Sequence, residues 1–156
     1  MAETNNKENK NSELVGYCGL YCPDCPLFLG KISDMARDLR KELRRVEYDR
    51  FAKYISKFPA GKKFENFKEC YDGLGALMKF RCEKGCRQGG GTDNCQIRQC
   101  CQDQNLEGCW QCSKYDHCTK LDALNALHQN AHRKNLKIIE EKGTTEFAKG
   151  NRYWYS

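Results

Sequence analysis

The apolar residues of this chain recur mostly at steps of three and four positions, which is the spacing of an amphipathic α-helix. A first helix is predicted after Ser33, whose hydroxyl can cap it. Its apolar side is predicted to contain Met35, Leu39, Leu43 and Val46. Two further helices are predicted over residues 51–58 and 64–78, with Pro59 and Gly61 separating them.

The longest helix is predicted to follow the last cysteine. Thr119 and Asp122 have the spacing of a capping box at its start, and Gly143 is a natural stop. Strand signals are poor, because no segment sustains an alternation of apolar and polar residues and no Asn-Gly hairpin turn occurs. The predicted fold is therefore mainly α, a small helical bundle with cysteine-rich, metal-clamped loops and little or no β-sheet.

The chain is expected to begin with a tail. Residues 1–13 are polar and rich in Asn, Lys and Glu, which predicts a disordered segment without the apolar run of a signal peptide. Residues 14–156 are expected to form a single cysteine-rich, metal-binding domain, since a chain of this length is most simply one domain. No run of about 18 apolar residues occurs, so we expect a cytoplasmic protein without a membrane association.

Twelve cysteines dominate the chemistry of the chain. Ten of them are clustered, and they are Cys18, Cys22, Cys25, Cys82, Cys86, Cys95, Cys100, Cys109, Cys112 and Cys118. Pairs two residues apart, such as Cys109 and Cys112, supply adjacent corners of a tetrahedral zinc site. In a reducing compartment such clusters indicate a bound metal in preference to disulfides. The ten thiols are therefore the predicted ligands of one or two zinc ions.

The metal and its ligand pairing stay open at this point. Ten thiols exceed the eight that two four-cysteine sites need, so the surplus indicates bystanders, shared ligands or a polynuclear site. Iron–sulfur clusters accept the same ligands and are the alternative cofactor. Cys18, Cys22 and Cys25 have the spacing of radical enzymes that activate S-adenosylmethionine, but the parallel-stranded barrel and the chain length of those enzymes are missing.

The remaining two cysteines and the histidines have different expected roles. Cys70 and Cys101 are expected to pack as small apolar side chains. His117 lies next to Cys118 and is a candidate to replace a thiol. His128 and His132 are four residues apart, but the glutamate of the zinc-protease motif is absent, so both are expected on the polar surface.

The formal net charge of +6 raises the question of nucleic-acid binding. One divalent zinc held by four thiolates carries −2, so two such sites would lower the charge from +6 to about +2. Tyr153, Trp154 and Tyr155 beside Arg152 could stack on bases, but packing of these rings onto the core is the expected role. A nucleic-acid-binding zinc module is therefore a lesser alternative.

The cysteine clusters also carry a family resemblance. The segment from Gly16 to Pro26, the pair Cys82 and Cys86, the segment 95–101, the pair Cys109–Cys112 and Cys118 follow one another in a characteristic order. This order resembles the prokaryotic family called domain of unknown function 3795, over about residues 14–125. The resemblance implies a small, cysteine-rich, metal-binding protein without an established activity.

Two features depart from the family pattern. The family often has a C-x-G-C pair, where this chain has one more residue between Cys82 and Cys86. It also often has a cysteine three residues before the one that matches Cys95, and Thr92 stands there. The second departure puts any site that uses that cysteine in doubt.

Taken together, the residues predict a small zinc-binding protein that acts as a structural or interaction module with a protein partner. Catalysis is not expected, because no pair of nucleophile and base is recognisable. The alternatives are an iron–sulfur or thiol redox protein, or a protein that handles metal.

Overall fold

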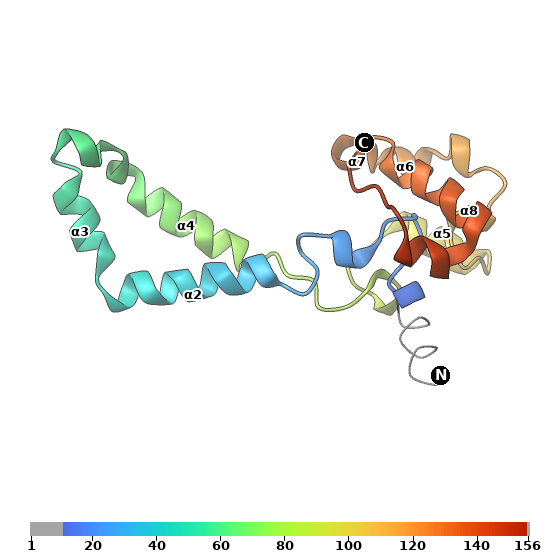
Figure 1. Ribbon diagram of the computed structural model, residues 1–156, viewed down its shortest axis with the longest axis horizontal. Coiled ribbons are helices and arrows are strands. Elements are labelled where there is room, and N and C mark those ends of the chain that lie inside the picture. The colour runs from blue at the N-terminus through green and yellow to red at the C-terminus, as the bar shows by residue number, and fades with distance from the viewer. Residues whose placement is uncertain (1–10, 156) are drawn as a thin grey trace. The chain divides into compact units, whose positions relative to one another are not determined.

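In the computed structural model, which describes residues 11–155, the chain divides into two compact units (Figure 1). Unit 2 is the continuous segment Leu29–Arg81, and unit 1 combines the segments before and after it. Within the described part, seven α-helices occur and β-structure is limited to two isolated bridges. The mainly α prediction is therefore confirmed. Residues 1–10 of the expected tail lie outside the described residues, and a single domain from residue 14 onward stays a prediction.

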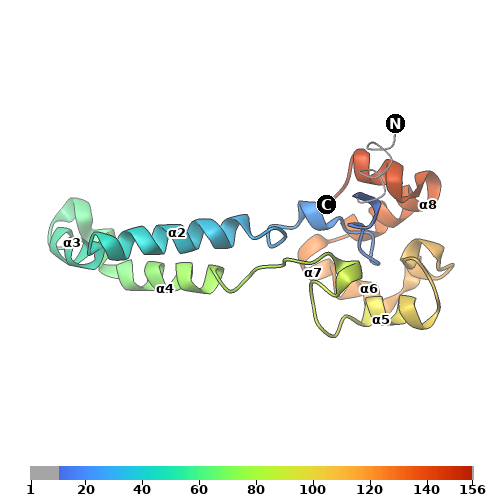
Figure 2. The ribbon, with the colours of Figure 1, turned by 90° about the horizontal axis from the view of Figure 1, so that it is seen from below.

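Unit 2 contains three α-helices and one 3-10 helix. They are α2 (Lys31–Arg45), α3 (Tyr48–Ile55), η2 (Pro59–Asn66) and α4 (Phe67–Leu77). Helices α2 and α4 run side by side in Figure 2, and Figure 1 shows that they converge where α2 begins and α4 ends and diverge toward α3. The apolar spacing therefore predicted the helices of this unit correctly, apart from the short 3-10 helix before α4.

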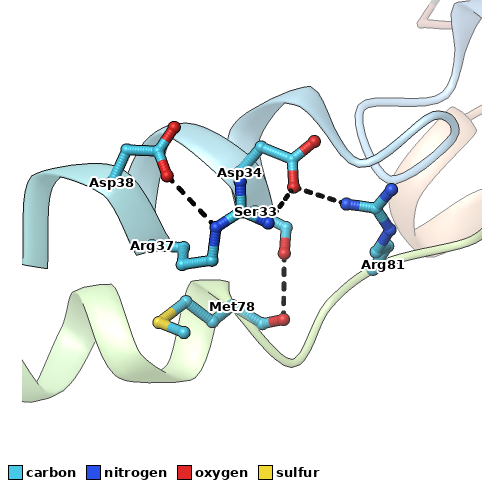
Figure 3. Close-up of polar contacts among 6 residues, drawn as sticks. All are labelled: Ser33, Asp34, Arg37, Asp38, Met78 and Arg81. Carbon is cyan, nitrogen blue, oxygen red and sulfur yellow. Dashed lines mark hydrogen bonds and ion pairs between the residues drawn. The ribbon is translucent and has the colours of Figure 1, made fainter. Parts of the chain in front are cut away.

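Small residues let α2 and α4 approach each other closely. Ser33 and Ala36 are the buried residues of α2. A Cβ added to Gly75 of α4 would lie only 2.0 Å from Nη1 of Arg40. The Ser33 hydroxyl donates to the Met78 carbonyl at 2.9 Å and links the start of α2 to the end of α4 (Figure 3). Because Ser33 lies inside α2, its predicted role as the helix cap is wrong.

Aromatic rings around Tyr48 join the other elements of unit 2. The Tyr48 ring centroid lies 5.3 Å from that of Phe51, 6.3 Å from that of Phe64 and 5.4 Å from that of Phe67. Phe67 in turn lies 6.2 Å from Tyr71. These tilted rings pack α3 against η2 and α4, where aromatic side chains contribute a large contact area.

Unit 1 is built around the cysteine segments. Its α-helices are α5 (Gln96–Asp103), α6 (Thr119–Asp122), α7 (Asn125–His128) and α8 (Ala131–Lys149). Its 3-10 turns are η1 (Cys22–Asp24), η3 (Cys86–Gln88), η4 (Cys109–Gln111) and η5 (Tyr115–His117). The core includes Val15, Tyr21, Ile97, Trp110, Leu121, Leu136, Ile139 and Phe147. No helix among residues 11–155 is long and apolar enough to cross a bilayer.

The single long helix predicted from Thr119 onward is wrong, because three helices occupy this part of the chain. Gln129 has a positive φ of 51° and ends α7, and Gly143, with a non-helical φ of 78°, divides α8 into two helical stretches at the predicted stop. The breaks accompany the burial of His128 and His132, which are 5% and 0% exposed. The expectation that both histidines lie on the surface is therefore also wrong.

The C-terminal aromatic segment is held on unit 1 by buried polar side chains. The Asn135 amide donates to the Tyr153 carbonyl at 2.8 Å and accepts from the Tyr153 backbone N–H at 2.9 Å. The Nδ1 atom of His128 lies 2.8 Å from the Trp154 carbonyl, and the two rings meet edge to face. The segment thus packs on unit 1 as expected, although Tyr155 is 62% exposed.

Candidate metal centre

Six of the ten predicted ligands line one cavity of unit 1, which has a volume of about 260 Å³. They are Cys18, Cys22, Cys25, Cys82, Cys86 and Cys95. The rest of the wall is largely apolar and includes Leu20, Phe28, Ile97, Leu124, Leu127 and Trp154. The fold therefore brings together all thiols of the first two clusters and the first thiol of the third.

The first cysteine segment is a tight turn fixed by its backbone. The Gly19 amide donates to the Gly16 carbonyl at 2.9 Å. Gly19 has φ of 82°, and a Cβ there would lie 2.9 Å from the Leu136 side chain, so glycine is required at this position. A 3-10 turn follows, which the Cys25 amide closes by donating to the Cys22 carbonyl at 2.9 Å. These contacts set the positions of the thiols on this segment.

The second cysteine segment begins where the chain returns from unit 2. Cys82 forms an isolated parallel bridge with Phe28, and its amide donates to the Leu27 carbonyl at 2.9 Å. Four residues later, the Cys86 amide donates to Cys22 Sγ at 3.4 Å. Cysteines that flank the inserted unit 2 in the sequence are thus neighbours in unit 1.

Arg98 of α5 is a site residue that sequence reasoning missed. Its side chain lines the cavity and is only 8% exposed. The guanidinium donates, at 2.8 to 3.2 Å, to the carbonyls of Cys86, Gly90, Thr92 and Asp93. It therefore fixes the glycine-rich loop between two cysteines and places a permanent positive charge beside the thiols. No local pattern marked it, because its partners are backbone atoms of a loop.

Burial in the cavity favours the protonated form of two thiols, Cys18 and Cys22, when no cation is present. Burial raises the pKa of Cys18 to about 12, and the neighbouring thiols of Cys86 and Cys95 add to the rise. Burial also raises the pKa of Cys22, with further contributions from Cys86 and Cys82. A divalent cation reverses this balance, because it stabilises thiolates and releases their protons.

The six thiols suit a metal in kind and in number, and their sulfur atoms would have to move closer together to bind it. Among residues 11–155, no three Cys, His, Asp or Glu side chains are grouped closely enough to hold an ion as they stand. Tetrahedral zinc binds sulfur at about 2.3 Å, which puts ligand sulfurs about 3.8 Å apart. Thiolates suit zinc and iron–sulfur clusters.

The other four predicted ligands do not line this cavity. Cys100 Sγ accepts hydrogen bonds from Gln104 at 3.0 Å and from Lys120 at 3.3 Å. Cys109 is buried in the core, and Cys112 and Cys118 are half-buried elsewhere in unit 1. The structure thus separates the ten clustered thiols into six at the cavity and four outside it.

Of the two cysteines expected to pack as small apolar side chains, one is buried and the other is exposed. Cys101 is 2% exposed and belongs to the core, as predicted. Its Sγ lies 3.6 Å from that of Cys109, and this hydrogen bond lowers the pKa of Cys101 and raises that of Cys109, which burial raises further. Cys70 is exposed on α4, so the prediction of a buried residue there is wrong. His117 is exposed and does not line the cavity.

One side of the cavity carries an aromatic residue with an unusual polar atom. Trp154 lines the cavity, and its indole Nε1 is buried without a hydrogen-bond partner within the described residues. His128 lies on the same wall. Neither was predicted as part of the site, because both lie far from the cysteine clusters in sequence and reach the cavity only through the packing of the C-terminal segment.

Comparison with known proteins gives one match. A model of the family described as "Protein of unknown function (DUF3795)" matches residues 14–123. Neither the curated proteins nor the solved structures include a significant match. The matched segment contains all six cysteines of the cavity, together with the inserted unit 2.

Proposed function

Because the chain belongs to the family of proteins of unknown function DUF3795, whose description names no activity, we propose a function from the cavity itself. We propose that the protein binds metal through the thiolates of Cys18, Cys22, Cys25, Cys82, Cys86 and Cys95. The gathering of these six thiols from three chain segments around one cavity supports this proposal. Thiolate ligation needs reduced cysteines, so the proposal also places the protein in a reducing compartment such as the cytoplasm.

Zinc is the proposed metal, with two ions sharing six thiolates. Six ligands exceed the four of one tetrahedral ion, and two ions can use six when some thiolates bridge them. Two divalent ions with six thiolates carry a net charge of −2, which the buried guanidinium of Arg98 partly offsets. A closed set of protein ligands leaves no position for water, so the proposed role is structural and not catalytic.

The centre would stabilise the part of unit 1 next to the two ends of the inserted segment. Cys25 and Cys82 flank the inserted segment Leu29–Arg81 in the sequence, and both line the cavity. Joining both ends of a long insertion reduces the conformational entropy of the unfolded chain. We propose that the metal stabilises unit 1, and that unit 2 contacts a partner.

An iron–sulfur cluster is the second candidate, and the size of the cavity favours it. A volume of about 260 Å³ is several times the roughly 30 Å³ that one water molecule takes up in the liquid. The apolar part of the wall also resembles the low-dielectric surroundings that tune cluster potentials. A cluster would use four of the six thiols and leave two protonated.

Elemental analysis of protein purified without oxygen tests both candidates. Two zinc ions per chain and a colourless sample support the first, whereas bound iron with visible absorbance replaces it by the second. Cys22→Ser and Cys86→Ser should lose metal, and Cys70→Ser, which alters an exposed thiol, is the matched control. Cys112→Ser should also keep its metal. Metal-free protein with all thiols titratable in the native state would refute metal binding altogether.

A further inference from the structure

The positive charge of the protein is concentrated in unit 2. Residues 29–81 contain 14 Lys and Arg against 8 Asp and Glu, so this unit carries the whole formal excess of +6. All cysteines of the cavity belong to unit 1. Their ionisation therefore cannot neutralise unit 2. The expectation that thiolates remove the basic character applies to the net charge of the whole chain and not to unit 2.

Most acidic side chains of unit 2 are already paired. Asp34 accepts from Arg37 at 2.7 Å and from Arg81 at 2.6 Å (Figure 3), and Glu42 binds Arg45 at 2.5 Å. Seven exposed basic residues make no ion pair within residues 11–155, and they are Lys31, Lys41, Arg44, Lys53, Lys57, Lys63 and Lys79. Their charge is available for an anionic partner.

The same unit exposes an apolar stripe along α2. Ile32, Met35 and Leu39 follow at steps of three and four, so they share one side of the helix, and Val46 follows directly after its last residue. These four side chains are 45%, 63%, 48% and 44% exposed. The buried positions of α2 are the small residues Ser33 and Ala36. An amphipathic helix normally buries its large apolar side chains. Here the helix packs through small residues and leaves the apolar stripe open.

Aromatic residues extend this surface beyond α2. Phe51 and Tyr54 of α3 are 48% and 60% exposed, and Phe58, just after α3, is 47% exposed. Lys53 and Lys57 alternate with them in the sequence. The exposed side chains of unit 2 are thus of two kinds, apolar and cationic, which are interleaved along the same elements.

The combination of apolar and cationic side chains indicates which kind of partner unit 2 binds. A second copy of the chain would bring two units of +6 together, so charge repulsion opposes it. A nucleic acid would use the lysines and the aromatic rings, but the aliphatic stripe of α2 would have no role on bases or phosphates. An anionic lipid surface uses both, since acyl chains accept the aliphatic side chains and the headgroups attract the basic ones.

We propose that unit 2 docks onto anionic membranes, with α2 lying in the plane of the interface and its stripe Ile32, Met35, Leu39 and Val46 inserted among the lipids. The helix is too short and too charged to span a bilayer, which agrees with surface binding. Basic residues such as Lys53 and Lys57, which alternate with the exposed aromatic side chains, contact the headgroups. This inference rests on unit 2 and does not depend on the metal proposed for unit 1.

Co-sedimentation of the full-length protein with vesicles tests the proposal. Vesicles of phosphatidylcholine with about a quarter phosphatidylserine should bind the protein, and vesicles of phosphatidylcholine alone should bind it at least roughly tenfold more weakly. Binding to the anionic vesicles should also weaken as salt is raised. Absence of binding to the anionic vesicles would overturn the proposal.

Variants separate the apolar from the electrostatic contribution. Met35→Gln with Leu39→Gln removes apolar contact without changing charge, and it should lower vesicle affinity roughly tenfold or more. Both side chains are exposed, so an unchanged circular dichroism spectrum should accompany the loss. Lys53→Gln with Lys57→Gln should weaken binding as well, whereas Lys84→Gln with Lys142→Gln, the same charge change in unit 1, should not.

Two other outcomes would assign the surface to a different partner and overturn the proposal. One is tight binding of mixed-sequence oligonucleotides together with no vesicle binding. The other is a concentration-dependent dimer in sedimentation equilibrium that Met35→Gln with Leu39→Gln abolishes. Equal loss of vesicle binding in the unit 1 control would likewise show that net charge alone, and not the surface of unit 2, is responsible.

Discussion

Cys101 Sγ and Cys109 Sγ lie 3.6 Å apart in the core of unit 1. A disulfide has an S–S length of about 2.04 Å, so a small shift of either side chain suffices to join them. We expect the azo oxidant diamide to take two electrons and two protons from this pair and leave a Cys101–Cys109 disulfide. Peptide mapping after alkylation of the remaining thiols should identify the linked peptides.

Two variants test whether this pair and no other is oxidised. Cys101→Ser should abolish the linked peptide, and Cys70→Ser, which removes an exposed thiol of unit 2, should leave it unchanged. A disulfide between Cys109 and Cys112 in the wild-type protein would contradict the prediction, because it would show that sequence proximity outweighs the packing seen in the core.

Helix spacing predicted the elements of this fold better than their packing. The apolar steps after Ser33 located α2, but they implied a buried face, whereas Met35 and Leu39 are exposed. The periodicity reports which residues share a side and not what covers that side. Likewise, the break at Gln129 depends on one positive φ that no residue type in the sequence required.

The cysteine spacing included Cys18 and Cys86 among the candidate ligands, and both line the cavity. They come from segments on the two sides of the inserted unit 2. The spacing also grouped Cys109 with Cys112, while Cys109 packs against Cys101. Local spacing cannot reveal which clusters meet, because that depends on the path of the chain between them.

Arg98 gives a prediction about how the cavity is held in shape. Arg98→Lys keeps the positive charge, but one ammonium cannot reproduce four hydrogen bonds to carbonyls of a single loop. We expect metal retention against a chelator to fall, because Cys86 and Cys95 lose their relative placement. Arg37→Lys, an exposed change in unit 2, is the control. Equal retention by both variants would show that the loop does not position the ligands.

The ion pair between Arg152 and Asp24 fastens the C-terminal segment to the first cysteine segment. Arg152 donates to Asp24 at 2.9 and 3.2 Å, and also to the carbonyls of Ala148 and Gly150. Arg152→Ala should lower the free energy of unfolding by about 1 to 3 kcal/mol, since a half-buried carboxylate and two carbonyls lose their donor. Urea denaturation measures the difference.

A second ion pair supplies the control for this change. Arg45 binds Glu42 on the surface of α2, where both side chains are more than half exposed. Arg45→Ala should therefore leave the urea midpoint within experimental error of the wild type. If both variants shift the midpoint equally, the loss of any arginine side chain would explain the result and the contact with Asp24 would have no special role.

His132 gives the stability of unit 1 a dependence on pH. Burial and the nearby Arg133 lower the pKa of His132 to about 4, from an ordinary value of 6.5. Below pH 6.5 the unfolded chain therefore binds a proton that the folded chain excludes, so the free energy of unfolding falls as the pH drops from 6.5 to 4. The loss attributable to this residue should reach up to about 3 kcal/mol.

Urea titrations over this pH range test the role of His132. His132→Gln should reduce the slope of the free energy of unfolding against pH, whereas His117→Gln, at an exposed position, should keep it. Equal slopes for His132→Gln and the wild type would mean that other groups set the acid sensitivity.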